Sequence, residues 1–201
     1  MSSEKMGLII LAGGKSSRMG SDKAFLKLGK HTLIETIISN FNQAGLMEVT
    51  IVTNNADKFS DLEAKVVEDY YPGSGPLAGI HSGLINSNCF ANYVVPCDMP
   101  FISSAILDKL LLYKEDYDVV VPTMNGKFQP LAAIYTKECI KHIEYLLKNN
   151  ITKVIELYGM VKTCYVELEE NLFFFNINTP EDYLEAQRSI MEAEKNGENF
   201  S

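Results

Sequence analysis

A glycine-rich, basic stretch follows the first apolar segment of the chain. One residue after the apolar segment 7–11 come two glycines, Gly13 and Gly14. Three cations follow closely: Lys15, Arg18 and Lys23. Because glycine has no Cβ, backbone N–H groups can approach an anion closely, and such turns form anion-binding nests. The guanidinium of Arg18 can bind phosphate oxygens in a bidentate manner, whereas the Lys23 ammonium is a compact charge suited to a departing pyrophosphate. The stretch predicts a phosphate-binding loop, with a glycine turn and solvated cations as the alternative.

Neither of two familiar phosphate loops fits this stretch. The Walker pattern would align Gly14 and Lys15 but needs glycine at position 9, where Ile9 stands. The dinucleotide fingerprint G-x-G-x-x-G fails because Gly13 and Gly14 are adjacent and position 17 is Ser17. A P-loop ATPase is therefore disfavoured.

A single acidic residue, Asp98 in PCDMP, follows an expected core strand over residues 93–96. Open α/β sheets bind their ligands at the carboxyl ends of their strands. Since Mg²⁺ favours one or two carboxylates together with substrate phosphates, Asp98 is a candidate magnesium ligand. An Asp after a strand is also often a turn or helix cap. Cys97 has no evident activating base beside it, which favours a structural thiol.

Two further segments combine turn residues with chemistry. PGSGPLAGIHSGL, residues 72–84, holds four glycines and two prolines and predicts either a close-approach surface for a phosphate or flat ring, or a rigid turn before a helix. We interpret His81 within that helix as structural or partly exposed rather than as a catalytic base. In FNINTPED, alternation places Asn176 and Asn178 on one face of a strand, where their amides could bind a polar substrate, although Asn is also a common turn residue.

Strand-like and helix-like segments alternate along the first half of the chain. Expected strands are residues 7–11, 49–53, 66–67, 93–96, 119–121, 128–135, 161–166 and 172–175. Expected helices follow capping boxes at Thr32 and Thr179 and cover residues 103–113 and 137–148 as well. This alternation predicts a parallel sheet in an α/β fold. We expect one domain over residues 1–201, with a frayed tail from residue 194.

Composition excludes several classes of protein. The chain has 201 residues, is 46% hydrophobic and has a net charge of −8, so it lacks the broad positive footprint needed for nucleic acid or an anionic membrane. The four cysteines are scattered and predict neither a disulfide framework nor a zinc site. No apolar run approaches the ~18 residues of a membrane span. We expect a cytoplasmic protein.

Four motifs, in this order, resemble those of the molybdenum cofactor guanylyltransferases of the MobA type: LAGGKSSRMGSDKAFL, VVEDYYPGSGPLAGI, VPCDMPF and NINTPEDY. The resemblance covers almost the whole chain. It implies a Rossmann-like three-layer α/β/α sandwich of the glycosyltransferase-A type with a mostly parallel sheet. It also implies transfer of GMP from GTP to molybdenum-molybdopterin, with Mg²⁺ as cofactor and pyrophosphate as the second product.

The resemblance also assigns residues to roles. For catalysis it implies Lys23 and Asp98, with Asp98 as the metal ligand, and we add Arg18 as the other catalytic cation on the chemistry of the basic loop. For the nucleotide it implies Leu11, Ala12, Gly13, Gly14, Lys23, Thr53, Asn54, Asp69 and Asp98. For the second substrate it implies Pro76, Leu77, Gly79, Asn176 and Asn178. Possible protein partners are those that donate molybdopterin or mature molybdoenzymes.

Other functions stay open at this point. Related cytidylyltransferases tend to show LAAG where this chain has LAGG, which favours GTP over CTP by resemblance alone. A sugar-phosphate nucleotidyltransferase or a non-catalytic pterin carrier would share much of the same pattern. In GKFQPLAAIY we match the strand but no definite pterin contact.

Overall fold

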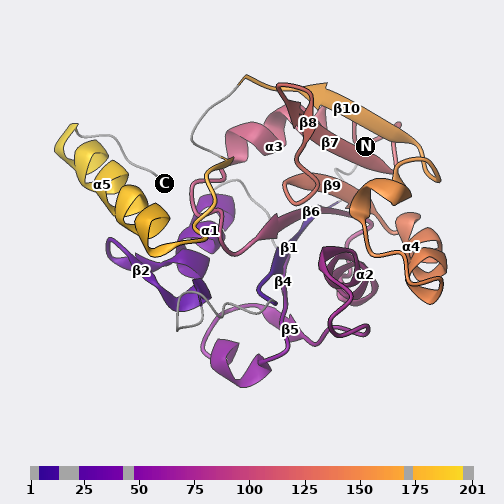
Figure 1. Ribbon diagram of the computed structural model, residues 1–201, viewed down its shortest axis with the longest axis horizontal. Helices are drawn as coiled ribbons and strands as arrows, with labels where there is room; N and C mark the ends of the chain where they lie inside the picture. Colours follow the sequence, from indigo (N-terminus) through magenta and orange to yellow (C-terminus); the bar gives the residue numbers. More distant parts are fainter. Residues whose placement is uncertain (1–4, 14–22, 43–47, 170–173, 197–201) are drawn as a thin grey trace. The chain divides into compact units, whose positions relative to one another are not determined.

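The computed structural model describes residues 5–13, 23–42, 48–169 and 174–196 (Figure 1). Its chain forms two compact units. The first comprises Met1–Gly14, Leu46–Pro96 and Ala105–Glu170, and the second comprises Lys15–Gly45, Cys97–Ser104 and Asn171–Ser201. The expectation of one domain stays a prediction.

The first unit is built on an 8-stranded sheet. Its strands are β1 (Gly7–Leu11), β4 (Glu48–Val52), β5 (Lys65–Val67), β6 (Ala91–Pro96), β7 (Val119–Met124), β8 (Lys127–Phe128), β9 (Ala133–Thr136) and β10 (Thr163–Glu167). The order is β10-β7-β9-β6-β1-β4-β5, with β8 paired to β7. Among the described strands of this sheet, β8 and β9 run antiparallel to their neighbours, and all other pairs are parallel. The predicted α/β fold with a mostly parallel sheet is confirmed.

The strand order reverses at the β1–β6 pair, because β4 and β5 lie on one side of β1 and β6 on the other. Leu11, the last residue of β1, is in register with Val52 of β4 and Pro96 of β6. Open α/β sheets bind ligands at such a switch point, beyond the carboxyl ends of the strands. The fold therefore predicts a ligand site at the residues that follow Leu11, Val52 and Pro96.

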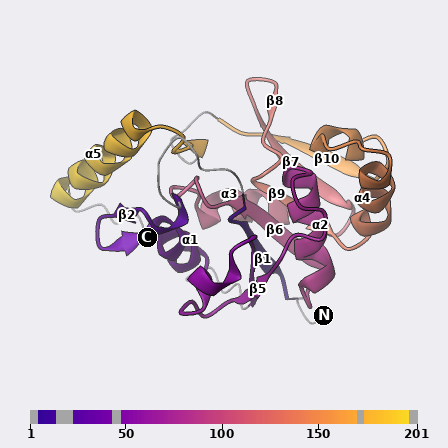
Figure 2. The same ribbon diagram turned by 60° about the horizontal axis from the view of Figure 1, so that its bottom comes forward.

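Helices cover both faces of this sheet. Helices α2 (Pro76–Asn86) and α4 (Cys139–Lys148) contact each other and lie side by side on one face, whereas α3 (Ser104–Leu111) lies on the opposite face (Figures 1 and 2). All five residues of β1 are buried, as expected for a strand covered on both faces. Short 3₁₀ helices η2 (Ala56–Phe59) and η3 (Val154–Leu157) complete the unit.

Glycines allow α2 to lie very close to β1. A Cβ added at Gly83 would sit 2.5 Å from Cγ2 of Ile9, and one added at Gly79 would sit 3.1 Å from Cδ2 of Leu11. Two of the four glycines in this segment therefore serve helix–strand packing. Gly73 and Gly75 have positive φ values of 82° and 76°, a conformation that favours glycine.

The second unit combines η1 (Lys23–Phe25), a small hairpin of β2 (Lys27–Leu28) and β3 (His31–Thr32), α1 (Leu33–Asn42) and α5 (Pro180–Asn196). Its apolar cluster contains the buried residues Leu28, Leu33, Phe101, Ile177 and Ala186. The predicted capping box of α1 is confirmed, since the Thr32 backbone N–H donates to Oε2 of Glu35 over 2.7 Å.

Two strand predictions were wrong in part. The run 128–135 is divided into β8 and β9, because Pro130 has no N–H to donate and the Ala132 N–H closes a turn onto the Gln129 carbonyl. Phe174 and Phe175, expected in a strand, pair with no strand. Phe175 instead packs against Phe101, with ring centroids 6.2 Å apart. Residues 172 and 173 lie outside the described residues.

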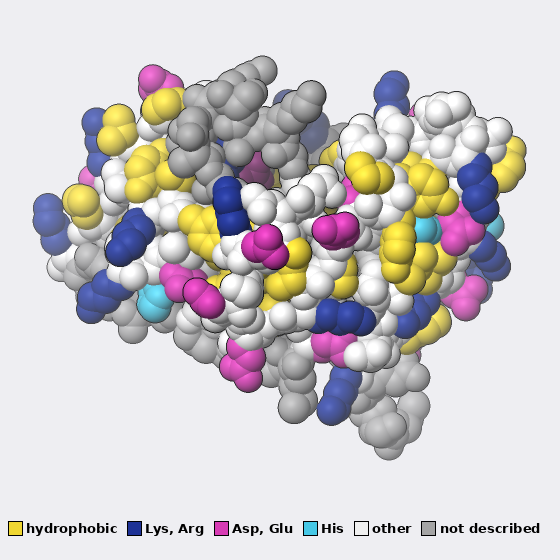
Figure 3. Space-filling view, turned by 90° about the horizontal axis from the view of Figure 1, so that it is seen from below, with side chains coloured by type: hydrophobic (Ala, Val, Ile, Leu, Met, Phe, Trp, Pro, Cys, Tyr) yellow, Lys and Arg dark blue, Asp and Glu magenta, His cyan; other side chains and the backbone are white. Residues whose placement is uncertain are grey.

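Charged side chains and cysteines are distributed over the described parts of the chain. Figure 3 shows one face of the molecule, on which acidic and basic side chains are interspersed among the described residues. No helix in the described ranges is long and apolar enough to cross a membrane. All four cysteines are free thiols, and burial raises the pKa of Cys139 to about 12.

Candidate active site

Three of the sequence motifs meet at the side chain of Lys23 in the second unit. The Lys23 ammonium donates to Oδ1 of Asn178 over 2.9 Å, and it lies 3.8 Å from Oδ2 of Asp98. The side chains of Lys23 and Asp98 are 16% and 23% exposed, so both charges are partly desolvated while still open to a ligand. We call these three residues the lysine triad.

Backbone contacts hold Asp98 in this position. The Ile177 N–H donates to the Asp98 carbonyl over 2.9 Å, which ties the residue after β6 to the segment carrying Asn178. Beyond Asp98, the Asn40 side chain donates to the carbonyls of Pro100 and Ile102. The Asp98 carboxylate therefore sits on a chain segment fixed at both sides.

A capping box positions Asn178 at the start of α5. Oδ2 of Asp182 accepts the backbone N–H groups of Asn178 and Thr179, each over 2.8 Å. In return, the Asp182 N–H donates to Oγ1 of Thr179 over 3.1 Å. The bond from the Asn178 N–H is the largest cause that lowers the pKa of Asp182. The predicted cap is confirmed, and it orders the backbone that carries the triad amide.

The electrostatics of Asp98 suit a site that takes up positive charge. Burial raises the pKa of Asp98 above its ordinary value, and the Lys23 ammonium opposes this only in part. A carboxylate held in a partly desolvated place with one cation at 3.8 Å has further capacity for a positive partner. Such a group can bind a divalent cation, or it can orient Lys23.

Asn176 does not join the triad. Its side chain donates to the Phe174 carbonyl over 3.2 Å. The expectation that Asn176 and Asn178 share one face of a strand was wrong, because residues 175–178 form no strand and Ile177 between them is buried. Phe175 and Ile177 enter the apolar cluster of the second unit, and this packing sets the chain direction.

In the first unit, the residues predicted for the nucleotide follow the ends of β1 and β4. The Ala12 N–H donates to the Val52 carbonyl over 2.9 Å, and the Thr53 N–H donates to the Val67 carbonyl over 3.0 Å. Buried Thr53 accepts the Asn55 N–H at its Oγ1, whereas Asn54 is exposed. These contacts extend the sheet beyond its last strand residues and fix the turns that leave the switch point.

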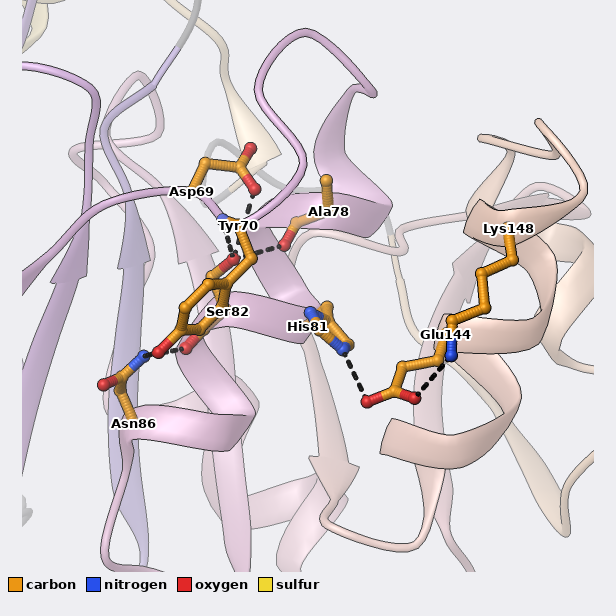
Figure 4. Close-up of polar contacts among 8 residues, drawn as sticks. All are labelled: Asp69, Tyr70, Ala78, His81, Ser82, Asn86, Glu144 and Lys148. Carbon is orange, nitrogen blue, oxygen red and sulfur yellow. Dashed lines mark hydrogen bonds and ion pairs between the residues drawn. The ribbon is translucent and has the colours of Figure 1, made fainter.

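Asp69 lies in the loop that connects β5 to α2. Its Oδ1 accepts the Tyr71 N–H over 3.0 Å. The same Oδ1 lies 3.1 Å from Oγ of Ser82 (Figure 4). The Asp69 carboxylate therefore stabilises the conformation of the loop that carries it.

The residues predicted for the second substrate at the start of α2 differ in exposure. Pro76 is exposed at the first helical position, Leu77 is fully buried in the core, and Gly79 packs on β1. Leu77 can therefore offer only backbone to a ligand. Gly14 and Arg18 lie outside the described residues.

The side chains around Asp98 decide whether this site could bind the magnesium ion that the sequence motifs imply. Within the described ranges, no three side chains of His, Cys, Asp or Glu gather into a group that could hold a metal on its own. Asp98 alone provides a carboxylate at the triad, and Mg²⁺ commonly combines one or two carboxylates with substrate phosphates and water. The residues present fit an ion that arrives with a polyphosphate.

Some residues of this region were not found from the sequence. No role was predicted for Asn40, or for Ser82 within the segment 72–84, because a single polar residue in a helix is common and the partners that define its role lie 12 or more positions away. His81 was interpreted as structural, and the structure agrees. It is 2% exposed, and its Nε2 lies 3.4 Å from Oε1 of Glu144.

The sheet has a switch point at β1 and β6, the kind of position at which open α/β folds bind ligands, and the second unit carries the partly buried Lys23–Asp98 pair. Residues 8–162 match the family described as the MobA-like NTP transferase domain. The chain belongs to this family and is a nucleotidyltransferase.

Individual relatives agree with the family. Proteins named "Probable molybdenum cofactor guanylyltransferase" from Pelotomaculum thermopropionicum and Clostridium perfringens (strain ATCC 13124) are 39% and 40% identical, each over 89% of this chain and 90% and 94% of their own lengths. The crystal structure of molybdopterin-guanine dinucleotide biosynthesis protein A from Archaeoglobus fulgidus superimposes with a TM-score of 0.78. It is 26% identical and covers 93% of this chain and 100% of its own.

Proposed function

We propose that the protein transfers GMP from GTP to the terminal phosphate of molybdenum-molybdopterin, forming the guanine dinucleotide cofactor and pyrophosphate. The relatives named as guanylyltransferases, at 39–40% identity, support the reaction class and both substrates. The observation that carries the proposal is the lysine triad, in which residues of three separate motifs meet at one ammonium.

Within this proposal, residues of the first unit bind the nucleotide. Leu11, Ala12 and Gly13 leave β1 at the switch point, and Thr53 and Asn54 leave β4 beside it. Gly14, which lies outside the described residues, completes the predicted turn. Asp69 serves the nucleotide from the loop after β5, and its ordered carboxylate supports that role.

Lys23, with Arg18 as the second proposed cation, neutralises the triphosphate and stabilises the charge that grows on the departing pyrophosphate. A positioned ammonium acts most strongly where charge develops in the transition state and water is partly excluded. The bond to Asn178 orients the Lys23 ammonium before substrate arrives. Asp98 holds Lys23 from the other side and carries the magnesium site.

Magnesium, held by Asp98 together with substrate phosphates, would add positive charge at the triphosphate. The acceptor phosphate is already ionised at neutral pH, so the attack on the α-phosphorus needs no strong general base. The chain's own residues then contribute mainly by positioning the two substrates and by neutralising charge.

For the second substrate, we propose the start of α2 and the amides near α5. Pro76 is exposed, and no side chain of the described residues caps the N-terminus of α2, where the Ala78 N–H donates to the Gly75 carbonyl. An uncapped helix N-terminus favours an anionic ligand. Leu77 and Gly79 would contribute through backbone or by shaping the helix. Asn178 would contact the substrate directly, and Asn176 would order the preceding turn.

The decisive experiment incubates purified protein with Mg²⁺, molybdate-loaded molybdopterin and either GTP or CTP. We expect pyrophosphate release and a product with the mass of the guanine dinucleotide only in the GTP reaction. Product from CTP alone would identify a cytidylyltransferase instead. Pterin binding without pyrophosphate release from either nucleotide would identify a carrier and refute the proposal.

A further inference from the structure

The loop of residues 69–75 leads from the carboxyl end of β5 into α2. β5 pairs with β4, whose carboxyl end neighbours that of β1, so the loop begins at the edge of the sheet where open α/β folds bind ligands. It carries Asp69, which the proposed function assigns to the nucleotide. The position of this loop therefore bears on nucleotide affinity.

Ser82 of α2 forms hydrogen bonds with the start of this loop. Its Oγ accepts the Tyr70 N–H over 2.9 Å and lies 3.1 Å from Oδ1 of Asp69 and 3.0 Å from the Ala78 carbonyl, either of which can accept its proton (Figure 4). Ser82 is fully buried. A single hydroxyl therefore accepts the backbone N–H of the loop and is placed to donate to its carboxylate.

His81, the preceding residue on α2, holds the same loop through its ring. The imidazole makes edge-on contacts with Tyr70 and Tyr71, with centroid separations of 6.2 and 5.3 Å. From α4, Glu144 lies 3.4 Å from His81 Nε2 and is itself paired with Lys148 over 3.3 Å (Figure 4). The loop is thus linked through α2 to α4.

We propose that Ser82 and His81 are positioning residues for the nucleotide, which hold Asp69 and the loop 69–75 in a binding-competent arrangement without touching the ligand themselves. This inference rests on the proposed function, because it takes Asp69 as a nucleotide contact. Ser82 acts on the backbone and carboxylate, and His81 acts on the two tyrosine rings.

A matched pair of serines tests the inference. Ser87, the C-cap of the same helix, is also buried, and its hydroxyl likewise accepts a backbone N–H, that of Cys89, and donates to side-chain oxygens. It lies at the opposite end of α2 from the loop. Ser82→Ala and Ser87→Ala should therefore lower the melting temperature to a similar degree.

Only Ser82→Ala should weaken the nucleotide site. We expect the Kd for GTP with Mg²⁺, measured by calorimetry without pterin, and the KM for GTP to rise about tenfold, with kcat nearly unchanged, on the scale of one buried hydrogen bond lost. The Tyr70 amide should exchange its hydrogen faster in Ser82→Ala and at the normal rate in Ser87→Ala. Ser82→Thr, which keeps the hydroxyl, should restore most of the affinity.

The remaining outcomes separate this inference from the proposed function. Equal GTP affinity in Ser82→Ala and Ser87→Ala, or an unchanged Tyr70 exchange rate, overturns the inference. Failure of the wild-type protein to bind GTP also overturns it. Wild-type protein that binds GTP but makes no guanine dinucleotide refutes the proposed function alone, since the affinity comparison needs no transfer reaction.

Discussion

The two units of this chain place their chemistry on different kinds of support. In the first unit, β1 is buried on both faces and α2 packs on it through glycines, so the predicted nucleotide residues leave a rigid sheet. In the second unit, the lysine triad is fixed by hydrogen bonds from loops and from the cap of α5. The first unit contributes mainly backbone geometry, and the second contributes partly desolvated charge. Substitutions should separate these two contributions.

The largest effect is expected from Asp98→Asn. Loss of the carboxylate removes the magnesium ligand and should abolish Mg²⁺-dependent transfer. Because burial raises the pKa of Asp98, its neutral form is favoured at low pH, and that contribution to stability is lost as the pH rises through the folded-state pKa. The melting temperature of Asp98→Asn at pH 7 should thus equal or exceed that of the wild type. Retained activity would exclude Asp98 as the metal ligand. A large drop in melting temperature would contradict the conclusion that burial disfavours the charged form of Asp98.

The next largest effect concerns Lys23. Lys23→Ala should lower kcat by ~100-fold or more, on the scale of one transition-state charge contact of roughly 3 kcal/mol. Steady-state assays with varied GTP and with varied pterin substrate check this. Lys27→Ala, an exposed lysine in the neighbouring hairpin, is the control and should leave kcat unchanged. If Lys23→Ala altered only the KM for the pterin, the assignment of Lys23 to the triphosphate would be wrong.

In the first unit, Gly83→Ala should destabilise the fold by about 1–3 kcal/mol, because its Cβ would lie 2.5 Å from Cγ2 of the fully buried Ile9 in β1. Gly79→Ala should cost less, since the nearest atom, 3.1 Å away, is the end of the Leu11 side chain. Denaturant unfolding of both variants measures the difference. Equal stability of Gly83→Ala and wild type would show that α2 does not depend on this close approach.

A smaller effect should distinguish the two asparagines. Asn178→Ala removes the acceptor that orients Lys23 and should lower kcat/KM about tenfold, on the scale of one hydrogen bond to a charged group. Asn176→Ala removes only a bond to the Phe174 carbonyl and should act mainly on stability. Measurements of kcat/KM for the two variants under identical conditions provide the comparison. A larger loss of kcat/KM in Asn176→Ala than in Asn178→Ala would contradict the roles assigned to the two residues.

The smallest effect is a pH dependence of stability in the first unit. Burial lowers the pKa of His81 below 6.5, although Glu144 opposes the shift, and Asp69, Lys148, Tyr70 and Tyr71 complete its surroundings. The unfolded chain then binds a proton more readily than the folded chain. Stability should therefore fall as the pH decreases from about 6.5 through the lowered pKa.

Chemical denaturation between pH 5 and 8 measures this dependence on His81. His81→Gln should flatten it, whereas His142→Gln, a half-buried histidine on α4, should not. An unchanged slope in His81→Gln would contradict the assignment.

Much of the local structure in both units could be predicted from patterns in the chain. The continuous apolar run of β1 indicated a strand buried on both faces, and the Thr32 and Thr179 capping boxes are present where the spacing placed them. These features are local, since each depends on residues only a few positions apart. The continuous strand expected over 128–135 was wrong because Pro130 and a local turn at Gln129 and Ala132 interrupt it. The expected direction of Asn176 was wrong because packing of Phe175 against the distant Phe101 decided it.

The sequence by itself determined the α/β class, the motif set, and the kinds of group available for phosphate chemistry, because apolar periodicity, capping and residue type act over short distances. Only the tertiary structure decided that the ammonium of Lys23 meets Asp98 and Asn178, and that one serine of α2 binds the Asp69 loop. These contacts join residues up to 155 positions apart, and no local propensity specifies them. They exist because burial of the apolar clusters brings separate loops to common positions, where the buried polar groups must find partners.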